Sequence, residues 1–292
     1  MEKLIYSLNL VFWGVSAGYV IQVLAVRGVI TLGIPILALR KRLQATALLF
    51  FNPIAILGAT WVAGIDSVRI AALPFLGIAA LVSGGLLAYA GSKVFAMNRK
   101  QTGAYIVCGG FTNIGSLGAL FCFIFLGEAG FALVPFYKLF EEFSYYAIGF
   151  PMARSFSDDA SGQESILARL KTVASDKFVL VAVGSIAAGL ILNLSGIQRP
   201  QFYGTVNAIF VPLAAFLLLV SIGMAMRFSS VGKYLKQGLF LALIKFVMVP
   251  FAIVSAGFFL GLGNMDAGLP LKVVLILSSM PVGFIAMVPP TI

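Results

Sequence analysis

The chain has no histidine, two cysteines and ten acidic residues among 292. Without histidine, neither a Ser-His-Asp arrangement nor a histidine-containing zinc site can be assembled, and the few carboxylates form no cluster outside 154–177 and Glu141-Glu142. No glycine-rich loop precedes a Lys-Ser or Lys-Thr pair, so a phosphate-binding loop for ATP is also missing. We therefore expect no enzyme activity, no cofactor and no metal.

The two cysteines, Cys108 and Cys122, fall within one apolar segment. A helical rise of about 1.5 Å per residue separates them by roughly 20 Å, which is beyond the reach of a disulfide. They form no paired metal-binding motif, and they do not indicate a redox compartment.

Charged residues are also scarce. They make up 10% of the chain, whereas 61% of the residues are hydrophobic. The mean hydropathy of +1.05 lies far outside the range of soluble domains. The composition predicts an all-α, multi-pass integral membrane protein, in the plasma or inner membrane, whose main partner is the lipid bilayer. In such a chain the net charge of +10 bears on orientation rather than on nucleic acid.

Apolar runs long enough to span a bilayer number nine when the chain is divided at charges, proline and glycine. They cover 5–26, 43–63, 70–90, 102–126, 129–152, 178–195, 203–226, 236–262 and 270–292. The first run lacks the positive start of a removable signal, so we expect it to remain as the first helix. The stretch 28–39 is too short to span, and we interpret it as an extension of that helix or as an interfacial piece.

The basic residues of the loops alternate from one side to the other. If the N-terminus is outside, the inward segments 27–42, 93–100, 154–177 and 227–236 carry four, three, four and three Lys or Arg residues. The outward side carries only Lys3, Arg69, Arg199 and Lys272. This bias predicts an external N-terminus.

One long polar stretch, 154–177, divides the chain after the fifth apolar run. We interpret it as a cytoplasmic linker between a first half, 1–153, and a second half, 178–292. Five runs precede it and four follow, so the second half is one helix short. An odd number of helices in each half makes the halves enter the membrane from opposite sides, as in an inverted repeat.

Polar and helix-breaking residues interrupt the fourth run of each half, at 112–118 and at 278–283. Paired breaks of this kind indicate a transporter site, since broken helices expose N–H groups and half-helix dipoles that favour an anion. The predicted substrate-binding residues are Thr112, Asn113, Gly115, Ser116, Gly118, Ser279, Pro281 and Gly283. Helix packing through small residues, amides and proline kinks is the alternative for each of them.

Charges inside the predicted spans are the second group of candidates. Lys138, Glu141 and Glu142 lie three to four residues apart and can share one helical face, where a carboxylate could take up a proton or where a Lys-Glu pair could neutralise itself. Lys245 stands alone in the eighth run. It either extends to the interface or faces the interior, where a carboxylate of Glu141 or Glu142 or an anionic substrate could pair with it.

Several short motifs occur in a fixed order along the chain. They are Asn113, Gly115 and Gly118 followed by Leu126-Gly127-Glu128-Ala129, the span from Pro212 to Gly223, Lys245 with Pro250, and Met280-Pro281. Together they resemble the auxin efflux carrier family of membrane transporters. The resemblance covers nearly the whole chain and rests on the order and spacing of the motifs. Plant members of the family export auxin, and bacterial members are described as permeases of malonate or other organic acids.

The resemblance implies ten helices in two inverted five-helix repeats, like the bile-acid sodium symporters, with the fourth and ninth helices broken and crossing. This sequence departs from the family pattern at Ala119, where a proline often follows Gly118. It also ends at Ile292 inside the ninth run, which leaves the tenth helix absent, as expected of a truncated sequence. We expect a permease of a small organic anion, whose transport is either coupled to protons or sodium or is facilitated diffusion. A homodimer is compatible with this expectation. The alternatives are a sodium-coupled symporter of the bile-acid type and a non-transporting receptor or scaffold.

Overall fold

The computed structural model describes residues 1–64, 68–156, 171, 174–228 and 231–283. The regular structure of these residues is helical apart from a short antiparallel bridge between Thr112 and Val282. Among the described residues, seven helices are long and apolar enough to cross a membrane, as expected of a multi-pass membrane protein. They are Glu2–Val26, Ile36–Trp61, Arg69–Val94, Ile114–Tyr137, Lys177–Leu194, Phe202–Gly223 and Gly232–Phe259.

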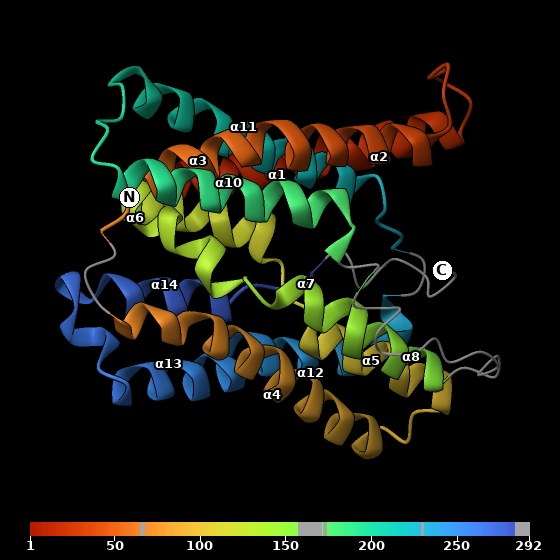
Figure 1. Cartoon of the computed structure of the whole chain (residues 1–292). Coiled ribbons are helices and arrows are strands. Elements are labelled where there is room, and N and C mark those ends of the chain that lie inside the picture. Colours follow the sequence, from red (N-terminus) through yellow and green to blue (C-terminus); the bar gives the residue numbers. More distant parts are fainter. Residues whose placement is uncertain (65–67, 157–170, 172–173, 229–230, 284–292) are drawn as a thin grey trace. The chain divides into compact units, whose positions relative to one another are not determined.

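The described helices follow one another along the chain on both sides of the polar linker (Figure 1). Before the linker they are α1 (Glu2–Val26), α2 (Ile36–Thr46), η1 (Ala47–Phe51), α3 (Asn52–Trp61), η2 (Val68–Ala72), α4 (Leu73–Val94), α5 (Arg99–Gly110), η3 (Ile114–Gly118), α6 (Ala119–Tyr137), α7 (Glu141–Ser144), η4 (Tyr145–Gly149) and α8 (Phe150–Ser155). After it they include α10 (Lys177–Leu194), α11 (Phe202–Gly223), α12 (Leu235–Leu243), η6 (Ile244–Met248), α13 (Val249–Phe259) and α14 (Leu269–Ser278).

The chain forms two compact units, and each takes segments from both sides of the polar linker. The first unit comprises Met1–Gly64, Gly115–Ala132 and Leu180–Ser230, and the second comprises Ile65–Ile114, Leu133–Val179 and Val231–Ile292. The predicted division into 1–153, 154–177 and 178–292 is a division of the sequence and stays a prediction. Most of the linker lies outside the described residues.

In the first unit, α1 and α11 lie side by side (Figure 1). A Cβ atom on Gly18 would collide with the carbonyl oxygen of Val220, and one on Gly223 would collide with that of Val15. Glycine is therefore required on both helices for backbones to approach this closely. Such small-residue contacts are the usual basis of helix association in membranes, where lipid offers apolar side chains no less favourable surroundings.

In the second unit, α4 packs against α5 by the same means, since a Cβ on Gly84 would collide with the carbonyl oxygen of Gly109. The start of α5 is fixed by a capping box. Asn98 Oδ1 accepts the N–H of Gln101 at 2.9 Å, and Gln101 Oε1 accepts the N–H of Asn98 at 3.1 Å. A defined start and a glycine contact thus hold the helix that leads to the first predicted break.

Three π-helical turns share one cause. The turns η1, η4 and η6 each begin six residues before a proline, namely Pro53, Pro151 and Pro250. Because proline has no N–H, the regular i−4 pattern fails there, and the residue before each proline donates instead to the carbonyl five residues back. Wider turns of this kind are one way in which membrane helices tolerate proline.

The prediction for 28–39 was wrong in part. The first helix ends at Val26, and the second long helix already begins at Ile36 instead of near residue 43. Between them, Gly28 and Gly33 have positive φ angles of 71° and 66°, which end any extension of α1. Arg40, Lys41 and Arg42 consequently lie in the early turns of a helix and not in a loop.

The predicted runs 102–126 and 129–152 also have different boundaries. The first is interrupted between Gly110 and Ile114, and Gly127 leaves helical geometry with φ 73° and ψ −166°. The second run is interrupted at 138–140, a break that the sequence analysis did not predict. The break after Gly110 leaves 12 residues in α5, and the break after Ser278 leaves 10 residues in α14. Among the described residues, fewer helices therefore reach spanning length than the nine predicted runs.

Candidate functional site

The bridge in the second unit brings the two predicted breaks together. After α5 ends at Gly110, Phe111 is extended, with φ −74° and ψ 133°. After α14 ends at Ser278, the chain runs on through Val282 to Gly283. The N–H of Asn113 donates to the carbonyl of Pro281 at 2.9 Å, and the N–H of Gly283 donates to the carbonyl of Phe111 at 3.1 Å. Backbone groups freed by one break are thus paired by the other.

Gly283 permits this close pairing. A Cβ atom at position 283 would lie 2.9 Å from the carbonyl oxygen of Thr112 and 3.1 Å from its carbonyl carbon. Both distances are shorter than ordinary van der Waals contact, and the neighbouring atoms are backbone, which cannot move aside as a flexible side chain can. Any other residue here would push the two segments apart.

Lys245 reaches the break from η6. Its ammonium donates to Thr112 Oγ1 at 2.8 Å and to the carbonyl of Gly110 at 3.4 Å. The residue is 2% exposed, so its side chain faces the interior of the second unit and does not extend to the surface. Gly110 is the last residue of α5, where unpaired carbonyls and the negative end of the helix dipole favour a cation.

Tyr145 contacts the same residue from η4. Its hydroxyl accepts the N–H of Thr112 at 3.2 Å, lies 3.2 Å from the carbonyl oxygen of Thr112, and is hydrogen-bonded to Glu141 Oε1. Its ring packs on Phe111 with 4.0 Å between the centroids. Glu141 in turn forms an ion pair with Lys138 at 3.6 Å. Two charged groups, Lys245 and Glu141, therefore meet around Thr112, one directly and one through a phenol.

Both side chains belong to π-helical turns. Tyr145 is the first residue of the turn before Pro151, and Lys245 is the second residue of the turn before Pro250. Turns of this kind are frequent at functional sites. Tyr145 was missed by the sequence analysis. The feature of the sequence that could have drawn attention to it is Pro151, six residues later. Pro250 follows Ile244, the first residue of η6, at the same spacing.

A small cavity adjoins the site within the second unit. Its lining includes Thr112, Tyr137, Glu141 and Tyr145, and its volume is about 10 Å³. A cavity of this size and polarity can hold one water molecule. It is far too small for an organic anion.

The other predicted residues are placed as follows. Asn113 is buried in the bridge, and Ser279 ends α14 with φ −89° and ψ 10°. The turn η3, which follows the break, contains Gly115, Ser116 and Gly118 and belongs to the first unit. The non-helical residues of the break therefore lie before these two glycines and not at them. Glu142 is a residue of α7 whose side chain lies outside the described part of the structure.

A polar cluster in the first unit was not predicted as a site. Arg199 donates to both oxygens of Glu128, at 3.0 and 2.7 Å, and also to the carbonyl of Gly58 at 2.9 Å. The amide nitrogen of Asn207 donates to Glu128 Oε1 at 2.8 Å. Glu128 directly follows the non-helical Gly127, so this cluster ties the turn in α6 to α3 and α11.

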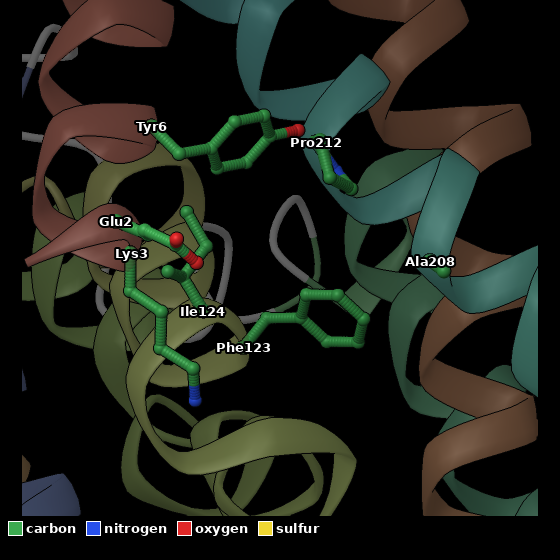
Figure 2. A pocket seen from close by; sticks show the side chains of 7 residues that line it. All are labelled: Glu2, Lys3, Tyr6, Phe123, Ile124, Ala208 and Pro212. Atoms are coloured by element: carbon green, nitrogen blue, oxygen red, sulfur yellow. The ribbon is translucent and has the colours of Figure 1, made fainter.

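The first unit also contains the larger hollow, of about 350 Å³ (Figure 2). Figure 2 shows the ring of Tyr6 reaching toward Pro212 and the ring of Phe123 directed toward Ala208, with Glu2 and Lys3 at one side. Its wall is mainly apolar, and it contains none of the predicted site residues.

Neither hollow resembles a metal site. Within the described ranges no group of three or more Cys, Asp or Glu side chains comes together in a way that could hold a metal ion.

No protein-family model and no curated protein matches this chain.

Proposed function

We propose that the protein is a secondary transporter of a small organic anion, such as a carboxylate, that works by alternating access around the crossed breaks at Asn113 and Pro281. This is the activity that the resemblance to the auxin efflux carrier family implies. The proposal includes ten helices in inverted repeats, an external N-terminus, and either coupling to protons or sodium or facilitated diffusion.

The observation that carries the proposal is the buried ammonium of Lys245 at the bridge. Its described partners, Thr112 Oγ1 and the Gly110 carbonyl, are both neutral, and among the side chains that the structure describes no carboxylate forms an ion pair with it. Glu141 attracts this buried charge electrostatically but does not contact it directly. A buried charge whose hydrogen-bond partners are neutral is costly, and a bound carboxylate would compensate it. Asn113, the residue after Thr112, is buried as well, and its amide offers both donors and an acceptor.

The antiparallel pairing of the breaks supports the inverted repeat, because repeats that enter the membrane from opposite sides bring equivalent helices together in opposite directions.

Contacts within each unit support the predicted alternation of the loops. Trp61 Nε1 donates to Ile197 in the first unit, at 2.7 Å, and both are predicted at the outer side. Arg99 donates to the Ser155 carbonyl in the second unit, at 2.8 Å, and both are predicted at the inner side.

Uptake into proteoliposomes tests the proposal. Purified protein is reconstituted and tested with radiolabelled carboxylates under imposed pH and sodium gradients, in the native form and as Asn113→Ala. We expect saturable uptake that the substitution lowers by at least 10-fold. The matched control is Asn193→Ala, which removes an amide that donates to the carbonyls of Trp61 and Ala63 in the other unit and should retain uptake once protein amounts are matched.

The gradients separate the alternatives. Dependence on sodium alone would favour a symporter of the bile-acid type, and dependence on pH would favour proton coupling. Uptake that Asn113→Ala leaves unchanged would refute the assigned site. Absence of uptake for every organic anion tested would favour a receptor or scaffold, in which the breaks serve only to pack helices.

A further inference from the structure

Two acceptors that the structure describes compete for the single proton of the Tyr145 hydroxyl. Glu141 Oε1 is one acceptor, and the carbonyl oxygen of Thr112, at 3.2 Å, is the other. The lone pairs of the phenol oxygen are available as well, and the N–H of Thr112 already donates to one of them at 3.2 Å. Tyr145 can therefore donate either to the carboxyl or to the bridge, but not fully to both.

The charge of Glu141 decides between the two acceptors. An ionised carboxylate accepts the phenol proton in a charge-assisted hydrogen bond, which is stronger than one to a neutral carbonyl. A protonated carboxyl can instead donate its own proton to the phenol oxygen. The phenol proton is then free to bond the carbonyl of Thr112, so that Tyr145 holds both backbone groups of that residue.

We propose that Glu141 is the proton-binding site of this protein and that Tyr145 transmits its protonation state to the break at Thr112. Uptake of one proton from water forms the carboxyl O–H, turns the Tyr145 hydroxyl toward the Thr112 carbonyl, and tightens the bridge between Asn113 and Pro281. Loss of that proton returns the hydroxyl to Glu141 and loosens the bridge. This inference rests on the proposed transport function, whose coupling ion it identifies as the proton.

The surroundings of Glu141 suit a group that changes its charge. Lys138 pairs with the carboxylate at 3.6 Å, and Lys245 is the other described cation at Thr112. The cavity beside Glu141 has room for one water that could deliver a proton, and Tyr137 is the remaining titratable residue in its lining. The α4 residues that line it, Gly77, Ala80 and Leu81, carry no titratable group.

Amide hydrogen exchange of the whole protein in detergent tests the inference without any substrate. The peptides covering Phe111–Ile114 and Pro281–Gly283 are followed between about pH 5 and about pH 8, and rates are corrected by the exchange of the unfolded protein. We expect protection of these amides to fall by about 2-fold to 10-fold from low to high pH, which is the size of one net hydrogen bond.

Two variants predict opposite levels of protection. Glu141→Gln cannot ionise, so protection should stay at the low-pH level of the native protein throughout. Tyr145→Phe keeps the ring on Phe111 but leaves Thr112 without the hydroxyl, so protection should be low at every pH. Tyr105→Phe is the matched control, because it removes a hydroxyl that donates to the Gln237 carbonyl in the same unit and should preserve the pH dependence.

A native-like pH dependence in either Glu141→Gln or Tyr145→Phe would overturn the inference, as would native protein whose protection does not change with pH. These results are separable from failure of the proposed function. Proton-linked protection without anion uptake would leave the proton site standing, whereas uptake without proton-linked protection would leave only the transport function.

Discussion

Replacement of Gly283 by alanine is the most direct perturbation of the bridge. The added Cβ would lie 2.9 Å from the Thr112 carbonyl oxygen and 3.4 Å from its nitrogen. Since ordinary contact begins near 3.5 Å, the segments must separate by roughly 0.5 Å. That movement stretches both bridge hydrogen bonds, now 2.9 and 3.1 Å long, beyond the favourable range. At about 1 kcal/mol net for each bond and about 1 to 2 kcal/mol for overpacking, we expect a loss of about 3 kcal/mol.

Two measurements detect this loss. The melting temperature in detergent should fall, and the amides of Asn113 and residue 283 should exchange about 100-fold faster, as a loss of about 3 kcal/mol requires. Gly238→Ala is the matched control, because that glycine lies in α12 with nothing within 4 Å of an added Cβ. If Gly283→Ala exchanges and melts like the control, the close pairing of the two breaks is not a feature of the native protein.

The remaining predictions concern the first unit. Arg199→Met leaves Glu128 without its bidentate partner, and because the two side chains are 12% and 25% exposed we expect a loss of about 2 kcal/mol in stability. The double variant with Glu128→Gln should recover part of it, and purely additive losses in that cycle would argue against the pair. Ala208→Phe partly fills the hollow of Figure 2. Carboxylate uptake should remain within about 2-fold, the effect of an ordinary surface substitution, whereas abolished uptake in folded protein would move the binding site into that hollow.

The sequence was sufficient to predict the all-helical membrane class and the regions of the two breaks, although the first break lies at 111–113 and residues 114–118 of the predicted break are helical. Long apolar runs must form helices in lipid because every backbone polar group has to be paired internally. Asn113, Pro281 and Gly283 stand out against such runs, since polar and helix-breaking residues are costly there without a reason. The starts of helices were harder to predict, as Ile36 shows, because Gly28 and Gly33 act through backbone conformation rather than hydrophobicity.

The contacts around Thr112 could not be predicted, because they depend on how helices pack and rotate. Lys245 was recognised as unusual, but its alternatives could be separated only when its burial and its bond to Thr112 were known. Tyr145 drew no attention, since a tyrosine in an apolar helix is ordinary. Both side chains lie in π turns that precede Pro151 and Pro250, but a proline in the sequence does not show which nearby side chain will contact Thr112.

Binding of a radiolabelled carboxylate to the purified protein is the most direct test of the crossing as an anion site. The comparison uses native protein, Lys245→Met, and Lys272→Met as the control, since Lys272 is exposed on α14 and donates to the Ala267 carbonyl. Loss of a buried charged partner costs about 3 kcal/mol or more, so Lys245→Met should weaken binding at least about 100-fold, while Lys272→Met should change it less than about 2-fold. Equal affinity in native protein and Lys245→Met would contradict the account.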